Sequence, residues 1–208
     1  DLHSFPTRRS SDLFVIRSAI YPFLIARQSG GKFILRIEDT DQSRFMEGAT
    51  ELILDTMRWL NLEWDEGPIV GGPFAPYFQT KRQEIYLEWA QKLIQKGRAY
   101  ADDTPPEKIE EYRQADHASQ TPYLYRNHRP ENPPKWREGL PIRFKTIPKH
   151  YQWHDEVMGD ISTGPEVCDD IILIKKDGLP TYNFAHIIDD TLMQCNEEIG
   201  RASCRERV

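Results

Sequence analysis

The segment that most constrains the fold is a short apolar run between two amphipathic helical patterns. Residues 32–37, KFILRI, are nearly continuously apolar, as in a parallel strand buried on both faces. Apolar positions recur at helical spacing before this run, in 16–28, and after it, in 47–60. Two consecutive glycines should end the first helix, and Pro22 predicts a kink or a late start in it. Helix, strand and helix in close succession indicate an α/β layer architecture.

Two further helices are predicted from capping boxes, in which a Thr and a Gln or Glu three residues later satisfy free backbone N–H groups. One box begins at Thr80, and its helix should end at Gly97. The other begins at Thr104, with Pro105 at the first helical position. The chain to about residue 175 then alternates like short antiparallel strands, and 177–190 turn into a helical run.

The two ends of the chain are related to each other at the DNA level. Residues 3–13 read HSFPTRRSSDL and residues 198–208 read EIGRASCRERV. One codon choice for the first stretch has a reverse complement that translates as the second, and this DNA resembles a common short-read sequencing adapter. We therefore expect 1–13 and 198–208 to be adapter-derived artefacts that belong to no fold, with the natural chain at 14–197.

Composition excludes several classes of protein. The net charge of −6 does not predict nucleic-acid binding, so any RNA contact must come from a local patch. One such patch lies at 120–140, where Arg126 and Arg129 stand among aromatic residues. Outside the flanks only Cys168 and Cys195 remain, without paired spacing, which indicates a reducing compartment. Because no run approaches the ~20 apolar residues of a membrane span, we expect no membrane partner.

The strand-like segment ends in a group of acidic side chains. Glu38, Asp39 and Asp41 surround Thr40 in the sequence IEDTD. Ligands of open parallel sheets bind at the carboxyl ends of strands, and a carboxylate there can receive a substrate ammonium through charge-assisted hydrogen bonds. Alternatively, Asp39 and Asp41 cap the next helix and complement its dipole. The residues by themselves leave both interpretations open.

Three motifs together carry a resemblance to the glutamyl-tRNA synthetases. FILRIEDTD at 33–41, WDEGPIVGGPFAPYFQTKR at 64–82 and DGLPTYNFAHIIDD at 177–190 follow one another at about the spacing of that family. The similarity covers essentially all of 14–195. Among sister enzymes, a glutaminyl-tRNA synthetase would vary the pentad IEDTD, and the glutamyl-Q tRNA synthetase paralogue usually has Leu in place of Thr40. Thr40 therefore favours the glutamyl-tRNA synthetases.

The resemblance implies a Rossmann-type nucleotide-binding domain interrupted by an inserted α+β domain that binds the tRNA acceptor end. A composition change near residue 99 and a return near 174 place the first Rossmann part at 14–99, the insert at 100–174 and the return at 175–197. The fold is expected to be incomplete at both ends. The His-Ile-Gly-His signature should precede Ile16, and the Lys-Met-Ser-Lys-Ser loop should follow the last residue, so the chain as written is expected to be inactive.

The implied activity is that of an ATP-dependent ligase. It joins glutamate to ATP in the presence of Mg²⁺, releases pyrophosphate, and passes the glutamyl group to the terminal ribose of tRNA-Glu. This chemistry rests on positioning and electrostatic stabilisation of phosphates rather than on a side-chain nucleophile, and no catalytic residue is predicted within the chain. We expect a monomeric cytoplasmic enzyme, with charging of tRNA-Gln left open. A non-catalytic RNA-binding relic of the same fold is the alternative from another class.

The resemblance also assigns roles to individual residues. Glu38 is expected to meet the α-amino group of glutamate, and Tyr182 to line the amino-acid pocket. At His186 the family often has Asn, so His186 either bonds the substrate or is a structural histidine. The plainer alternative for this motif puts Tyr182 and Phe184 in the core and leaves Asp189 and Asp190 as a solvated pair. Contact with tRNA is expected from Thr40, Asp41, Arg44, Arg126 and Arg129.

A metal site is not expected. Some relatives bind zinc in the insert through Cys-x-Cys and a later Cys-x-His. The corresponding positions here are Tyr100-Ala-Asp102 and the region of His128, which lacks cysteine. Because three cysteine ligands are missing, these residues cannot build a tetrahedral zinc site.

Overall fold

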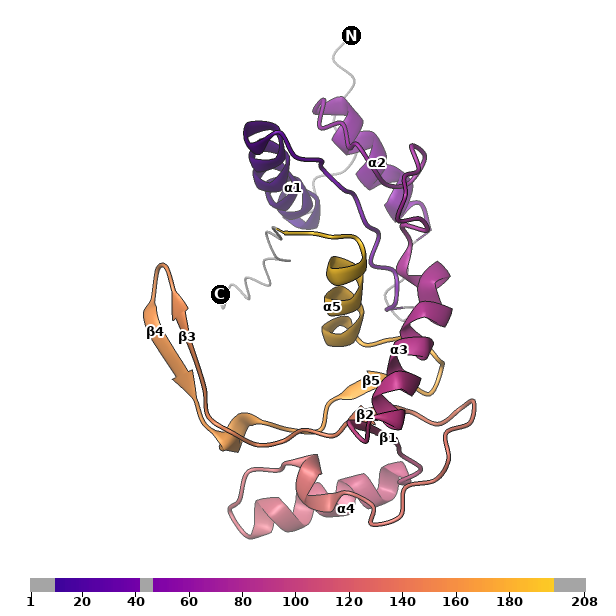
Figure 1. Ribbon diagram of the computed structural model, residues 1–208, viewed down its shortest axis with the longest axis vertical. Coiled ribbons are helices and arrows are strands. Elements are labelled where there is room, and N and C mark those ends of the chain that lie inside the picture. Colours follow the sequence, from indigo (N-terminus) through magenta and orange to yellow (C-terminus); the bar gives the residue numbers. More distant parts are fainter. Residues whose placement is uncertain (1–9, 42–46, 197–208) are drawn as a thin grey trace. The chain divides into compact units, whose positions relative to one another are not determined.

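A computed structural model of the chain describes residues 10–41 and 47–196, with side chains from residue 17 on (Figure 1). It divides into two compact units. The first runs up to Arg82 and resumes at Ile187, and the second is the continuous stretch Gln83–His186. The predicted insert, 100–174, lies wholly within the second unit, and its exact limits stay a prediction.

Most of the predicted flanks, 1–9 and 198–208, lie outside the described residues. Residues 10–13, however, belong to the first helix, so the expectation that all of 1–13 belongs to no fold is wrong for these four. Within the part of the chain that the structure describes, no helix is long and apolar enough to cross a membrane.

The first helix, α1 (Ser10–Ser29), runs through Pro22. A late start at this proline is therefore ruled out. The end of the helix is as predicted, because Gly30 adopts a φ of 70°, a value that glycine reaches without steric cost. The N–H of Gly31 then donates to the carbonyl of Ala26 at 2.9 Å, which closes the helix.

The predicted parallel strand at 32–37 is present only as isolated bridges. Ile34 bridges to Glu66 and Ile37 to Phe78, both in the parallel direction. The direction of pairing is as predicted. The ladder is broken because the segment pairs with two separate short pieces of chain rather than with one continuous strand.

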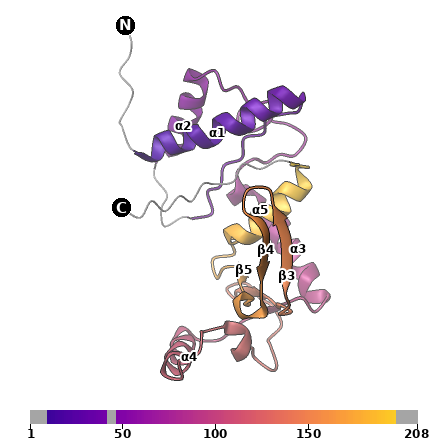
Figure 2. The same cartoon turned by 90° about the vertical axis from the view of Figure 1, so that its left-hand side faces the viewer.

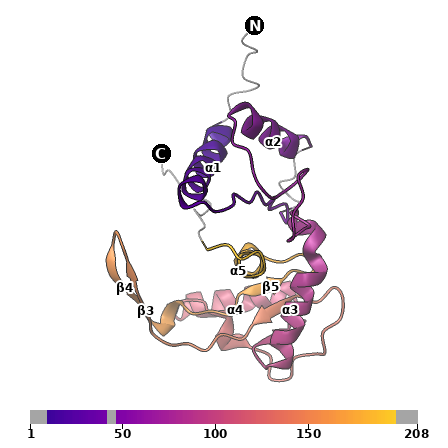
Figure 3. The same cartoon turned by 45° about the horizontal axis from the view of Figure 1, so that its top comes forward.

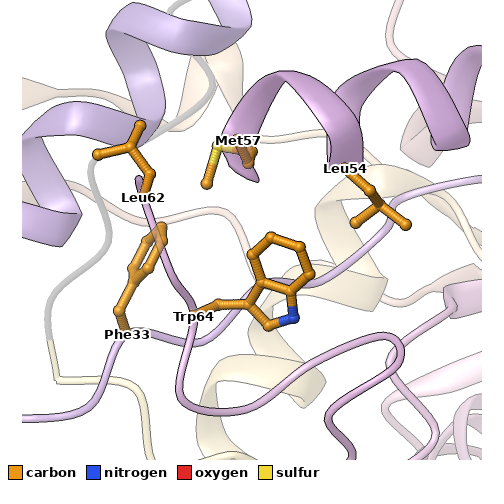
Figure 4. Packing of buried hydrophobic residues seen from close by; sticks show 5 residues of the cluster. All are labelled: Phe33, Leu54, Met57, Leu62 and Trp64. Carbon is orange, nitrogen blue, oxygen red and sulfur yellow. The ribbon is translucent and has the colours of Figure 1, made fainter. Parts of the chain in front are cut away.

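The core of the first unit packs helix α2 (Ala49–Trp59) on this bridged segment (Figure 4). The indole N–H of Trp64 donates to the carbonyl of Pro68 at 2.9 Å, so its polar group is satisfied inside the core. Helix α1 covers the cluster with Ala19, Ile20, Phe23 and Ala26. The buried cluster consists of Phe33, Leu54, Met57, Leu62 and Trp64.

The second unit combines three helices with short antiparallel strands, as predicted for 140–175. Its helices are α3 (Gln83–Gln95), α4 (Pro106–Ala118) and the first part of α5 (Tyr182–Leu192), with 3₁₀ turns η3 (Tyr125–His128) and η4 (Pro165–Val167). Its strands are β1 (Ala99–Ala101), β2 (Ile142–Phe144), β3 (Tyr151–Asp155), β4 (Gly159–Thr163) and β5 (Ile172–Ile174).

These strands form two separate antiparallel sheets. One has the order β1-β2-β5, and the other is the hairpin β3-β4. Within this unit the hairpin extends away from the three-stranded sheet (Figures 2 and 3).

Neither predicted capping box forms. The hydroxyl of Thr80 donates to Asp39, and the 3₁₀ turn η2 (Gln79–Arg82) precedes α3. Thr104 instead accepts a hydrogen bond from the hydroxyl of Tyr125 at 2.8 Å. Pro105 stands at the N-cap of α4, not at its first helical position, and no side chain caps that helix. Tertiary partners have replaced the local ones in both places.

We expect Met57→Ala to lower the free energy of unfolding by about 2–5 kcal/mol, because Met57 is 1% exposed and its loss leaves a cavity. Trp59→Ala, on the same helix but with 65% of the residue exposed, should change stability by no more than about 0.5 kcal/mol. Urea unfolding followed by circular dichroism measures both, and equal effects would contradict the described packing of α2.

Candidate functional site

Glu38 stands at the carboxyl end of the bridged segment and is partly open to solvent. Its side chain is 25% exposed, and its Oε1 lies 3.3 Å from a guanidinium nitrogen of Arg36. Arg36 makes a closer contact of 2.8 Å with Asp190. Because an ionised carboxylate offers about four acceptor sites, Glu38 keeps capacity for a second cationic partner. This is the property that an ammonium-binding carboxylate requires.

The neighbouring Asp39 has a structural role. Its carboxylate accepts hydrogen bonds from both the N–H and the hydroxyl of Thr80, at 2.8 and 2.6 Å. Helix α2 is preceded by Gly48 and has no side-chain cap, so the alternative that Asp39 or Asp41 caps this helix is wrong. Asp39 instead fastens the end of the bridged segment to η2.

The other residues expected to contact tRNA near this point differ in exposure. Thr40 is buried at 9% exposure, and Asp41 is exposed. Arg44 lies outside the described residues. Of this group, only Asp41 offers an exposed side chain within the described chain.

Asp189 is a buried carboxylate of the first unit. One interpretation of the sequence had placed it, with Asp190, in solvent. Asp189 is fully buried, and its two oxygens accept from the Nε of Arg82 at 2.8 Å and from the side-chain amide of Gln79 at 3.0 Å. The solvated-pair alternative is therefore wrong for Asp189. The sequence did hold a signal, because Asp189 follows the buried Ala185 by four residues and so falls on the apolar face of α5.

Tyr182 and His186 lie together at the start of α5. Their rings stack with centroids 4.8 Å apart, and His186 Nδ1 lies 2.8 Å from the carbonyl oxygen of Tyr182. Since a carbonyl only accepts, Nδ1 carries the proton, and Nε2 of the neutral ring is left as an acceptor. Tyr182 is 38% exposed and is not a core residue, whereas Phe184 is buried, as the plainer interpretation expects. The two residues belong to the second unit and Glu38 to the first.

The two arginines predicted to contact RNA from the insert both make internal contacts. Arg129 faces the carboxylate of Asp170 with two nitrogens, one of them at 2.6 Å, and also donates to the carbonyl of Thr146. Arg126 donates from its guanidinium to the carbonyl of Pro165 at 2.6 Å. Sequence reasoning identified these residues by their charge, but it did not anticipate their partners.

A second buried carboxylate, Asp102, organises the three-stranded sheet. It is 2% exposed and accepts from the Nε of Arg143 at 2.6 Å and from the hydroxyl of Tyr125 at 2.8 Å. The guanidinium of Arg143 also lies over the ring of Tyr125, 3.6 Å from its centroid. On the same sheet, the hydroxyl of Tyr100 donates to Asp170 at 2.8 Å.

These contacts shift the acid strength of both carboxyl groups. Burial acts to raise the pKa of Asp102, but hydrogen bonds from Thr104, Arg143 and Tyr125 outweigh it, so the pKa lies below its usual value. For Asp170 burial likewise acts to raise the pKa, and the bonds from Arg129, the Thr146 N–H and Tyr100 lower it overall. Both groups are therefore held as anions.

The residues that the resemblance compares with zinc ligands of some relatives make other contacts here. Tyr100 and Asp102 bond to Asp170 and Tyr125, respectively. His128 donates to Asp116 at 2.9 Å and stacks on Tyr112. Among the described residues there is no group of three or more His, Cys, Asp or Glu arranged to hold a metal ion.

Comparison with known proteins identifies the family. Residues 15–201 match the family described as tRNA synthetases class I (E and Q), catalytic domain. The chain belongs to this family. It is 46% identical over 186 residues to a glutamate–tRNA ligase of Clostridium botulinum, and 41% identical over 181 residues to one of Dehalococcoides mccartyi.

Solved structures of the family agree with this assignment. A glutamate–tRNA ligase of Elizabethkingia meningosepticum, crystallised with its amino acid, superimposes with a TM-score of 0.74 at 34% identity. The synthetase of Elizabethkingia anophelis gives the same values. Each of these matches covers 86% of this chain, which spans about 38% of the length of the Clostridium relative and 39% of each solved chain. The mixed helix and strand structure is thus that of the class I synthetases.

The buried carboxylates predict an acid-sensitive second unit. Their folded pKa values lie below those of the unfolded chain, so their stabilising effect is present above pH of about 4 and is lost as the pH falls through the folded values. We expect the melting temperature of the wild-type protein to fall steeply below pH of about 4. The melting temperature of Asp102→Asn should fall less steeply, because asparagine cannot ionise. Thermal scans from pH 7 to 3 measure both proteins. An equal dependence of melting temperature on pH in the two would show that Asp102 does not contribute to the acid sensitivity.

Proposed function

We propose that the complete protein to which this chain belongs attaches glutamate to tRNA through a glutamyl-adenylate. The chain belongs to the family of catalytic domains for the E and Q synthetases. The relatives and solved neighbours named above are glutamate–tRNA ligases. The second finding supports glutamate over glutamine as the amino acid, and tRNA-Glu as the acceptor.

The observation that carries this proposal is the state of Glu38. A carboxylate at the end of a parallel-paired segment is positioned where ligands of such folds bind. Glu38 remains partly exposed while its neighbour Asp39 is fully committed to Thr80. We assign Glu38 to the α-amino group of glutamate. Tyr182 and His186, whose rings stack at the start of α5, are also proposed to bind the amino acid, as the resemblance implies.

ATP with Mg²⁺ is the proposed co-substrate, which supplies the adenylate and the pyrophosphate leaving group. We assign no described residue to the metal ion, because none of the described clusters fits one. Magnesium in such sites is held largely by the phosphates and water. We further propose that the enzyme is a cytoplasmic monomer, as the resemblance implies.

Contact with the acceptor end of tRNA is proposed for Thr40, Asp41 and Arg44 in the first unit and for Arg126 and Arg129 in the second. Arg126 and Arg129 are partly exposed, so each can use remaining donors toward phosphate while it keeps its internal partner. Phosphate contacts of this kind make binding salt-dependent.

In the complete enzyme we expect Glu38→Gln to lower kcat/KM for glutamate about 10- to 150-fold, because a charge-assisted hydrogen bond contributes roughly 1.5–3 kcal/mol. Glu51→Gln, an exposed carboxylate on α2, serves as the matched control and should retain the wild-type value. Steady-state aminoacylation at varied glutamate measures both. An unchanged kcat/KM in Glu38→Gln would leave Glu38 as a partner of Arg36 only.

For RNA contact we expect Arg126→Glu to weaken tRNA affinity, with the larger loss at low salt, where phosphate contacts count most. Glu is chosen because it reverses the charge, and Arg126→Gln separates this effect from the loss of the bond to Pro165. Filter binding at several salt concentrations gives the result. Equal affinity of wild type and Arg126→Glu at low salt would remove Arg126 from the RNA-contact surface.

A further inference from the structure

The guanidinium of Arg36 is shared unequally between two carboxylates of the first unit. Its Nη1 donates to Oδ1 of Asp190 at 2.8 Å, whereas its Nη2 lies 3.3 Å from Oε1 of Glu38. The Arg36 side chain is only 11% exposed, so water screens these contacts little. Asp190 is therefore the closer partner of Arg36, and Glu38 is the more distant one.

Other contacts also hold Arg36 on the side of Asp190. The nitrogen that bonds Asp190 lies 3.8 Å from the sulfur of Met193, which directly follows α5. Asp190 is itself fixed, because its backbone carbonyl accepts a hydrogen bond from the N–H of Cys195 at 2.9 Å. None of these contacts uses Glu38.

The pKa of Arg36 reflects the same order of partners. Burial acts to lower this pKa, but the hydrogen bond to Asp190 and the charges of three carboxylates outweigh burial, so the pKa lies above its usual value. Of the three charges, that of Asp190 raises the pKa of Arg36 most and that of Glu38 raises it least. Geometry and electrostatics thus agree that Asp190 holds the guanidinium.

The group of charges around Arg36 has an excess of acid. Within the part of the chain that the structure describes, contacts link three carboxylates to two guanidinium groups, namely Glu38, Asp189 and Asp190 to Arg36 and Arg82. Asp189 contacts Arg82 at 2.8 Å and Asp190 contacts Arg36 at the same distance, so the excess negative charge falls on Glu38. The ammonium of a substrate would supply the third positive charge.

We propose that Asp190 is a positioning residue, which by holding Arg36 keeps the Glu38 carboxylate available to the α-ammonium of glutamate. Without a charge at residue 190, Arg36 can close on Glu38 from 3.3 Å to the ~2.8 Å of a charge-assisted hydrogen bond. The ammonium would then compete with a cation that is already bonded. The inference rests on the proposed function, because it takes Glu38 as the partner of the ammonium. Asp190 acts through Arg36 and does not itself touch the substrate.

The test uses the complete enzyme and compares glutamate with 2-hydroxyglutarate, in which a neutral hydroxyl replaces the ammonium. Asp190→Asn should raise the KM for glutamate about 3- to 10-fold with kcat near the wild-type value. This effect is smaller than that of Glu38→Gln, because the ammonium keeps its direct partner. The inhibition constant of 2-hydroxyglutarate should stay near the wild-type value, since a neutral group gains little from the charge of Glu38. Asp55→Asn, the same change on a side chain of α2 that is 72% exposed, is the matched control.

Two further variants separate positioning from a structural role. Asp190→Glu keeps the charge and should recover most of the affinity for glutamate. Arg36→Gln removes the competing cation, so it should not raise the KM for glutamate, either alone or combined with Asp190→Asn. Equal weakening of glutamate and 2-hydroxyglutarate in Asp190→Asn would overturn the proposal. If melting temperatures show that Asp190→Asn does not fold, Arg36→Gln decides, because a raised KM for glutamate would mean that Arg36 supports Glu38 rather than competes for it.

The proposed function can fail separately from this inference. If Glu38→Gln binds glutamate as well as the wild type does, the proposed role of Glu38 fails, and the role of Asp190 fails with it. If Glu38→Gln weakens glutamate binding but Asp190→Asn behaves like Asp55→Asn, only the role of Asp190 is rejected. Isothermal titration calorimetry with glutamate alone makes both comparisons even if the enzyme charges no tRNA.

Discussion

The buried carboxylate of Asp189 is the contact on which the first unit depends. A charge without solvent is costly unless donors surround it, and here Arg82 and Gln79 bond one oxygen each. Through them the end of α5 is tied to η2, and Asp39 in turn binds Thr80 in that turn. The segment that ends at Glu38 is thus fixed from two sides, while the Glu38 carboxylate contacts Arg36 and stays partly exposed. A rigid support with one partly exposed carboxylate is what substrate positioning needs.

The second unit also contains two buried carboxylates that are surrounded by hydrogen-bond donors. Asp102 follows β1 and Asp170 precedes β5, and each receives donors from both an arginine and a tyrosine. Removing one partner of such a group costs far more than the intact group contributes, since it leaves an uncompensated charge. These networks therefore act mainly to define one arrangement of the strands. Tyr100 and Asp102, the positions that the resemblance compares with the first cysteine pair of some relatives, both belong to these networks.

How far the sequence predicts this structure depends on the range of each interaction. Periodicity located α1, α2, α5 and the antiparallel strands, because the alternation of apolar residues is a local property. Both capping boxes failed because Thr80 and Thr104 found partners far along the chain, Asp39 and Tyr125. Glu38 could be predicted as a candidate site residue because it directly follows an apolar run. The buried role of Asp170 could not, since nothing adjacent in the sequence marks its donors.

The contrast between arginine and lysine explains why a basic run in the sequence is a poor guide to an RNA surface. Arginine carries five donors in a planar fork and is weakly hydrated, so it suits a buried carboxylate. Arg129 and Arg143 are both used in this way. Lysine is a strongly hydrated point charge that stays at the surface, as Lys149 does beside Tyr151. Phosphate responds to accessible charge, not to total charge. Within 120–140 the guanidinium of Arg129 is paired with Asp170, whereas Lys135 is exposed, so the total charge of the stretch overstates the charge that a phosphate can reach.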